Sequence, residues 1–175
     1  KYINLFSDFI SSDISIYSNY IFETQDKVNL IYSKLSKILN LKDFIIIHFD
    51  EKWIDLDPNG NELLNEIIYF QKSSNIKVIL TAYNNNFDYF NILKSNFDYC
   101  DFTNFDDISV FSKFNKSNIL ILDNLEIFLF ERFLKNSKMN VSCHSGFIAQ
   151  VCGSNEGKII DIINDKDELW YSCWK

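Results

Sequence analysis

Short runs of consecutive apolar residues alternate along the chain with longer segments that carry a helical apolar stripe. Runs that are apolar at every position are typical of strands buried on both faces of a parallel sheet. Phe44–Phe49 is the clearest run, and Tyr99–Phe102 is the weakest. The pattern predicts strands at 44–49, 77–81, 99–102, 118–123, 140–143 and 158–163.

Between these runs the apolar residues return every three or four positions, as on one face of a helix. The stripe from Val28 to Leu39 predicts a helix over 24–40, and Pro58-Asn59-Gly60 is a turn that opens a helix over 62–72. Residues 1–22 show no clean period, so we expect an irregular or inter-domain segment there and one domain over 23–175. Shorter helices are expected at 87–94, from Leu125 to Phe133, and at 147–152.

Strands that alternate with helices form βαβ units with right-handed crossovers and a parallel sheet. The predicted fold class is therefore α/β, a Rossmann-like three-layer open sheet that is mainly parallel, with helices on both faces. In such sheets ligands bind beyond the carboxyl ends of the strands, near the point where the strand order reverses. The segments expected to supply the site are 48–53, 81–88, 123–126 and 143–147.

Composition narrows the function classes. The 175 residues carry a net charge of −7, which argues against a nucleic-acid or anionic-membrane surface because both require clustered cations. The four cysteines form no C-x-x-C pair, and with only two histidines a structural zinc site is not expected. We expect the cysteines to be reduced, which favours a cytoplasmic protein. No apolar run is long enough to span a bilayer. Because the chain starts at Lys1, we expect a piece of a longer protein.

The segment Cys143-His144-Ser145-Gly146 follows a predicted strand and precedes a predicted helix. Backbone N–H groups at a helix start can bind phosphate, and Gly146 would let the anion approach closely. The alternative is an ordinary Ser145 N-cap with a turn glycine. A Cys143–His144 nucleophile pair is disfavoured, because adjacent strand residues point to opposite faces.

Other candidates lie at the ends of earlier strands. His48 and Lys52 could donate to a diphosphate, although a polar strand exit would look the same. Glu126 could accept ribose hydroxyls or could complement the dipole of the helix that follows it. No G-x-G-x-x-G, G-x-x-x-x-G-K-[ST] or G-x-S-x-G motif is present, which disfavours an NAD-binding domain, a P-loop nucleotidase and an α/β-hydrolase.

The order of several short motifs resembles the C-terminal, donor-binding half of GT-B glycosyltransferases, most closely the heptosyltransferase-like family 9. The matching segments run from about 26 to 163: Lys52-Trp53 after the first strand, Val78–Thr81, Asn124-Leu125-Glu126-Ile127, Cys143–Val151 and Ile159–Ile163. The chain departs from the family pattern at three positions. It has His144 where the family has Asp or Asn, Ala149 where the family has His, and Ile54 where the family has Pro.

The resemblance implies transfer of a sugar from a nucleotide diphosphate donor to a glycan or lipid-linked acceptor, such as a lipopolysaccharide. No metal or other cofactor is implied, and the location would be cytoplasmic, against the inner membrane. The catalytic base would lie in a separate N-terminal GT-B domain, so no catalytic residue is assigned and this piece alone should not transfer sugar. The residues expected to bind the donor are His48, Lys52, Thr81, Glu126, His144, Ser145, Gly146 and Phe147.

Two alternatives stay open at this point. One is a sugar-nucleotide epimerase of the same two-domain architecture. The other is a non-enzymatic α/β module that binds a ligand or regulates a partner, for which Asp50-Glu51 would be a sparse acidic cluster at the end of the first strand.

Overall fold

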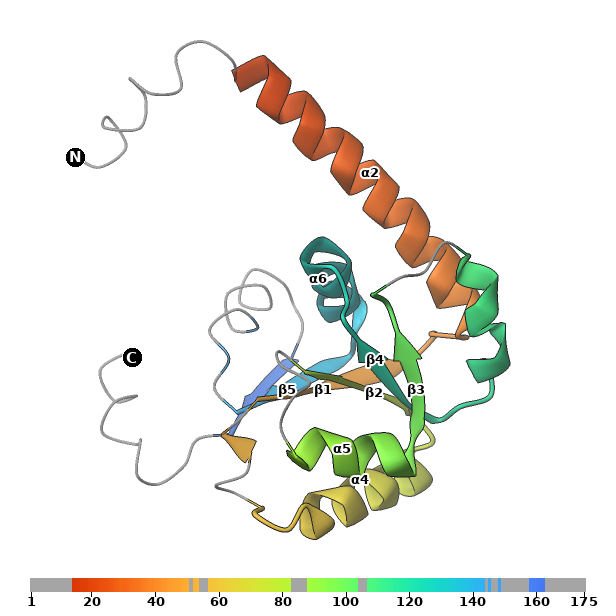
Figure 1. Ribbon diagram of the computed structural model, residues 1–175, viewed down its shortest axis with the longest axis vertical. Helices are drawn as coiled ribbons and strands as arrows, with labels where there is room; N and C mark the ends of the chain where they lie inside the picture. The colour runs from red at the N-terminus through yellow and green to blue at the C-terminus, as the bar shows by residue number, and fades with distance from the viewer. Residues whose placement is uncertain are drawn as a thin grey trace, which may run out of the picture.

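A computed structural model describes residues 14–50, 52–53, 57–82, 88–103, 107–143, 145, 148 and 158–162 (Figure 1). These residues form a six-stranded sheet in which every pair of neighbouring strands is parallel, with helices on both faces. The predicted Rossmann-like α/β fold is confirmed.

All six predicted strands are present, within one or two residues of their expected ends where the structure describes them. They are β1 (Phe44–Phe49), β2 (Lys77–Ala82), β3 (Asp98–Asp101), β4 (Ile119–Asp123), β5 (Met139–Ser142) and β6 (Lys158–Asp161). Their spatial order is β3-β4-β2-β1-β5-β6. With the edge strand β3 set aside, this order matches that of a doubly wound sheet, in which β1 lies in the middle and later strands are added on either side.

The helices are α2 (Ile14–Ile38), α4 (Asn61–Ser74), α5 (Asp88–Asn96) and α6 (Ile127–Asn136), with a 3-10 helix, η1 (Ile108–Phe114). The predicted start of α2 at Thr24 is wrong, and the helix includes residues 14 to 22, which were expected to be irregular. Extending an existing helix adds one backbone hydrogen bond per residue, so a continuous apolar stripe is not required for it. The 3-10 helix was not predicted, because its residues show neither a helical stripe nor a strand pattern.

The sheet separates two apolar cores. Alternate residues of β1, such as Phe44 and Ile46, pack with α2, η1 and α6, whereas Ile45 and Ile47 pack with α4 and α5. Figure 1 shows the same division, with α4 and α5 on one face of the sheet and α2 and α6 on the other. This arrangement explains why the strands are apolar at consecutive positions, because both faces of each central strand are covered.

The connections along the chain explain where the strand order reverses. From β1 through β2 to β3 the chain passes over the α4–α5 face, and from β3 through β4 to β5 it passes over the η1–α6 face. The chain crosses the sheet in opposite directions in these two halves, so right-handed crossovers place the connecting helices on opposite faces. After β5, Ile148 belongs to the core of α2 and α6. The connections that leave the adjacent strands β1 and β5 therefore diverge, which makes their carboxyl ends the switch point of the sheet.

A buried lysine organises the opposite, amino edge. The Nζ atom of Lys77, at the start of β2, donates to the carbonyl of Leu39, 2.5 Å away, and to that of Asn115, 3.2 Å away. Burial lowers the pKa of Lys77. Leu39 follows α2 and Asn115 follows η1, so one ammonium group satisfies carbonyls at the ends of two helices.

Two further features bear on the sequence predictions. Cys100 and Cys143 are buried cysteines that form no disulfide, and Cys152 and Cys173 lie outside the described residues. Within the part of the chain that the structure describes, no helix combines the length and the apolar character needed to cross a membrane.

Candidate functional site

The carboxyl ends of β1 and β5 meet at the switch point. In the strand register His48 pairs with Thr81 of β2 on one side and with Ser142 of β5 on the other. His48, Thr81, Asp123 and the residue after β5, Cys143, therefore lie at the same edge of the sheet, as the sequence predicts. We call the region formed by Asp50, Lys52, Cys143 and Ser145 the β1–β5 corner.

The loop after β1 is held against the sheet by Trp53. Its indole is 2% exposed, its Nε1 donates to the carbonyl of His48 at 2.9 Å, and its ring centroid lies 5.0 Å from that of Phe49. Further along, a carboxylate oxygen of Asp57 accepts from the backbone N–H of Leu63, 2.9 Å away, in the first turn of α4. Lys52 therefore lies between the end of β1 and the buried Trp53 rather than on a free loop.

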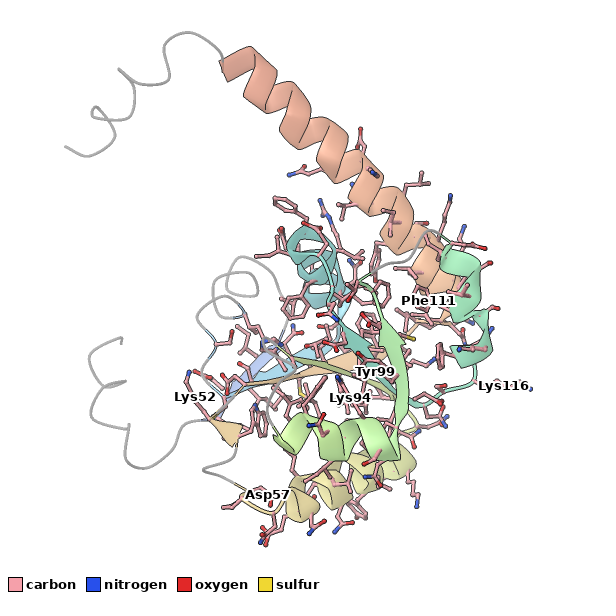
Figure 2. All side chains as sticks on the ribbon, in the orientation of Figure 1. Lys52, Asp57, Lys94, Tyr99, Phe111 and Lys116 are labelled. Carbon is pink, nitrogen blue, oxygen red and sulfur yellow. The ribbon has the colours of Figure 1, made fainter. Side chains whose placement is uncertain are left out.

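Lys52 reaches from the end of β1 toward the end of β5. Its backbone N–H donates to Asp50 Oδ1 at 3.0 Å, and its Nζ lies 3.7 Å from Asp50 Oδ2 and 3.5 Å from the carbonyl oxygen of Cys143. Its side chain remains 45% exposed, at the edge of the molecule in Figure 2. The corner thus presents a positioned, solvent-accessible cation at the place where doubly wound sheets bind ligands.

Ser145 lies two residues after Cys143, whose carbonyl contacts the Lys52 ammonium. Its Oγ accepts from the backbone N–H of Ile148 at 3.5 Å, the contact of an N-cap serine, and Ile148 is buried. This contact is the one expected of an ordinary N-cap serine. Phosphate binding by the same segment stays a prediction. His144, Gly146 and Phe147 lie outside the described residues.

His48 and Thr81 contact each other. The Nδ1 of His48 lies 2.9 Å from Thr81 Oγ1, and the imidazole stacks on Phe130 of α6 with ring centroids 5.2 Å apart. Both side chains are buried, and burial lowers the pKa of His48 to about 4. The imidazole is therefore neutral near pH 7 and belongs to the packed interior between β1 and α6.

Glu126 is the N-cap of α6. Its carboxylate accepts from the backbone N–H groups of Phe128 and Leu129, at 3.0 and 3.1 Å. The preceding strand, β4, is separated from β1 by β2, so the structure does not bring Glu126 to Lys52. Its contacts match the helix-terminus alternative, in which the carboxylate satisfies free N–H groups.

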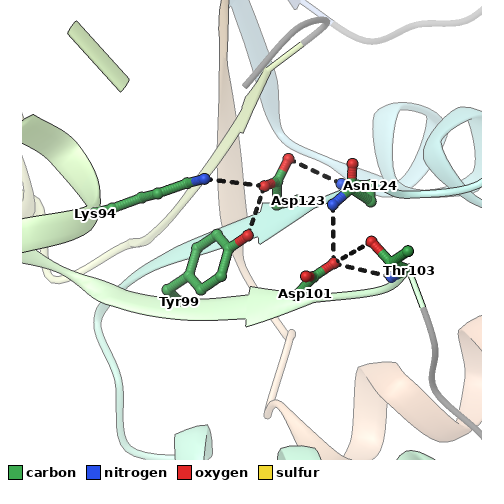
Figure 3. A network of polar contacts seen from close by, with 6 residues as sticks. All are labelled: Lys94, Tyr99, Asp101, Thr103, Asp123 and Asn124. Atoms are coloured by element: carbon green, nitrogen blue, oxygen red, sulfur yellow. Dashed lines mark hydrogen bonds and ion pairs between the residues drawn. The ribbon is translucent and has the colours of Figure 1, made fainter. Parts of the chain in front are cut away.

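A second polar group lies where β3 and β4 end, and we call it the β3–β4 corner (Figure 3). Asp123 is 2% exposed, yet it accepts from the hydroxyl of Tyr99 at 2.7 Å and lies 3.3 Å from the Nζ of Lys94. That ammonium also lies over the ring of Tyr99, 4.6 Å from the centroid. Burial, followed by the hydrogen bond to Asp123, raises the pKa of the Tyr99 hydroxyl.

The same corner contains Asp101 at the end of β3. Its Oδ1 accepts from the backbone N–H and the hydroxyl of Thr103 and from the side-chain amide of Asn124, at 2.6 to 2.9 Å. These hydrogen bonds lower the pKa of Asp101. Asn124 reaches it from a left-handed backbone conformation, with φ of 55°.

The sequence interpretation missed Lys94, Tyr99 and Asp101. A usable signal was present, because four of the six strands end in or just before an aspartate at the carboxyl edge: Asp50, Asp101, Asp123 and Asp161. Within the described ranges no three His, Cys, Asp or Glu side chains form a group that could hold a metal ion.

Comparisons with known proteins add no family and no function to this geometry. No protein-family model matches the chain, and no curated protein and no solved structure shows significant similarity to it.

Proposed function

We propose that this chain is the donor-binding half of a GT-B glycosyltransferase and binds a nucleotide diphosphate sugar at the β1–β5 corner. The observation that carries the proposal is the position of Lys52, whose ammonium bridges the two strands at the switch point. Its side chain is 45% exposed, so a phosphate oxygen can reach the ammonium from solvent.

In the proposed complex Lys52 stabilises the negative charge that develops on the leaving diphosphate. The backbone N–H groups of Ser145 and Gly146 would contact the same phosphates, and the N-cap contact of Ser145 Oγ with the N–H of Ile148 supports this. The acceptor and the catalytic base come from a partner domain in this proposal, so the chain alone binds the donor without transferring sugar.

Calorimetric titration with UDP, GDP, ADP and CDP tests the proposal. We expect one of them to bind, and Lys52→Ala to weaken that binding by about 1–3 kcal/mol through loss of a charge-assisted contact. Gly146→Val should weaken it further, because the added side chain would obstruct the phosphate.

Lys138→Ala is the matched control. Lys138 forms an exposed ion pair with Asp43, 2.9 Å away, at the amino edge of the sheet, so its removal should leave nucleotide affinity unchanged. If no nucleotide binds more tightly than about 1 mM, the donor-site proposal is wrong and a module for another ligand is favoured. If Lys52→Ala and Lys138→Ala weaken nucleotide binding equally, the loss comes from the change in net charge and not from a contact at the β1–β5 corner.

A further inference from the structure

Exposed cations gather where α2 and η1 end, in a chain that is acidic as a whole. The buried ammonium of Lys77 donates to the carbonyls of Leu39 and Asn115, so the segments that leave these two helices lie against each other. Residues 25–43 and 107–117 contain both ends and carry six lysines against three aspartates, whereas the whole chain has 17 basic and 24 acidic residues. We call the outer face of these two segments the α2–η1 surface, and its lysines are Lys27, Lys34, Lys37, Lys42, Lys113 and Lys116.

The six lysines are exposed, and none of them forms an ion pair with another residue that the structure describes. Two of the three aspartates have other partners, because Asp43 is paired with Lys138 and Asp107 caps η1. Cations are favoured in the last turn of a helix, which explains Lys37 and Lys113 but not the other four. Neither ion pairing nor helix ends therefore account for this concentration of positive charge.

An exposed apolar side chain shares a face with lysines on each helix. Leu30 lies three residues after Lys27 and four before Lys34, on the side of α2 opposite to the stripe that packs in the core. Val110 and Lys113 are three residues apart, which is one turn of a 3-10 helix. Leu30 is 57% exposed and Val110 is 55% exposed. Each helix thus presents an outer face that combines long flexible cations with an aliphatic side chain.

This combination indicates the kind of partner. Lysines are point charges on flexible stems, and six of them spread over two segments suit an extended array of negative charge better than one small anion. Nucleic acids and anionic lipid bilayers both offer such an array. Leu30 and Val110 favour the bilayer, because its interface takes up aliphatic side chains and a phosphate backbone offers them little. Lysine stems can lie along the same interface while their ammonium groups reach the headgroups.

We propose that the α2–η1 surface binds an anionic lipid bilayer, with its lysines on the headgroups and with Leu30 and Val110 in the interface. The net charge of −7 predicts no such surface, but it is an average over the molecule. Attraction to a charged bilayer decays within a Debye length, so it depends on the residues that face the bilayer. The inference does not depend on the proposed nucleotide site, because it uses none of the residues of the β1–β5 corner.

The test is co-sedimentation of the whole chain with two kinds of vesicle, phosphatidylcholine alone and phosphatidylcholine with about a third of phosphatidylglycerol. We expect binding to the anionic vesicles only, and a loss of that binding as salt is added, because salt screens the surface charge. Lys34→Gln and Lys116→Gln should each weaken binding by roughly fivefold, which corresponds to about 1 kcal/mol for each cation at a membrane surface. Both side chains are exposed, so the variants should fold as the parent chain does.

Lys72→Gln is the matched control, because Lys72 is exposed on α4, on the other face of the sheet. It changes the net charge by the same amount and should leave vesicle binding unchanged. A loss after Lys72→Gln as large as that after Lys34→Gln would trace the binding to net charge and overturn the proposal. Absence of binding to the anionic vesicles at low salt would overturn it as well.

Leu30→Gln and Val110→Gln separate a bilayer from other polyanions, because they leave the charge unchanged. Each should weaken vesicle binding by roughly fivefold through loss of apolar burial, and neither should alter any binding of polyuridylate. If the chain binds polyuridylate and both variants bind vesicles as well as the parent chain, the surface recognises nucleic acid and the lipid proposal is wrong. Failure of UDP, GDP, ADP and CDP at the β1–β5 corner would refute the proposed function and leave the vesicle result standing.

Discussion

At the β3–β4 corner the Asp123 carboxylate has a tyrosine hydroxyl 2.7 Å away and a lysine ammonium 3.3 Å away, and it is almost completely buried. At the β1–β5 corner Lys52 lies 3.7 Å from Asp50, and nearly half of its side chain is exposed. Both corners are at the carboxyl edge of one sheet, and both join a lysine to an aspartate that ends or follows a strand.

Both aspartates are buried, and the difference lies in how close and how solvated each pair is: Lys94 is 26% exposed and lies 3.3 Å from Asp123, whereas Lys52 is 45% exposed and lies 3.7 Å from Asp50. A buried carboxylate needs its cation, because its charge would otherwise lie uncompensated away from water. At the β1–β5 corner the ammonium is largely solvated, and the Asp50 carboxylate also accepts from the backbone N–H of Lys52, a bond that does not depend on the ammonium. The β3–β4 corner therefore contributes to stability, whereas the β1–β5 corner leaves a cation that can bind a ligand at little structural cost.

The largest expected effect follows from removing each lysine. Lys94→Met keeps the aliphatic chain and leaves Asp123 without its ammonium, so the free energy of unfolding should fall by about 3 kcal/mol. Lys52→Met should lower it less, by about 1 kcal/mol, because the Asp50 carboxylate keeps its bond from the backbone N–H of residue 52. Urea denaturation of both variants measures the difference, and equal losses would contradict the contrast between the corners.

A smaller effect concerns the histidine that lies in the sheet beside the β1–β5 corner. Burial lowers the pKa of His48 from 6.5 to about 4, so the unfolded chain takes up a proton between these values and the folded chain does not. The stabilising contribution is complete above pH 6.5 and is lost as the pH falls toward 4. Between pH 7 and pH 5 we expect a loss of about 2 kcal/mol.

His48→Gln should remove this pH dependence, because glutamine does not titrate and can still bond to Thr81. Unfolding by urea at a series of pH values provides the measurement. His144→Gln serves as the control, since His144 is the second of the two histidines in the chain. If His48→Gln keeps the full slope and His144→Gln loses it, the buried histidine is not the cause.

The smallest effect belongs to the hydroxyl of Tyr99. Tyr99→Phe removes its hydrogen bond to Asp123 but keeps Lys94 in place, so the free energy of unfolding should fall by about 1 kcal/mol. Tyr69→Phe, on an exposed side chain of α4, should change nothing measurable. A loss after Tyr99→Phe as large as that after Lys94→Met would show that the hydroxyl, and not the ammonium, compensates Asp123.

The strands could be predicted because covering both faces of a parallel sheet requires apolar residues at consecutive positions. Phe44–Phe49 is such a run, and its predicted and observed ends agree. The strand order depends on contacts between distant segments and has no local signal. The rule for open parallel sheets could predict that 48–53 and 143–147 lie at the same edge, but not that Lys52 contacts Cys143, which arises because β5 lies directly beside β1.

The candidate site was predicted less completely than the fold. The alternation of a strand shows that His48 and Asp50 share a face, but it does not reveal that Phe130 of α6 covers the imidazole. Glu126 was a candidate ligand contact because a carboxylate that follows a strand lies at the edge where ligands bind. Its bonds to the backbone N–H groups of Phe128 and Leu129 could not be predicted from the sequence pattern. The network around Asp123 was missed because Lys94 and Tyr99 come from different elements.

The bond from Lys77 to the end of α2 has a mechanical consequence. Tension on the N-terminal helix would reach β1 through the intervening backbone and β2 through the ammonium that holds the carbonyl of Leu39. These two strands lie in the interior of the sheet, each with a neighbour on both sides. A load on α2 is thus shared between two interior strands, and neither link leads to the edge strands β3 and β6.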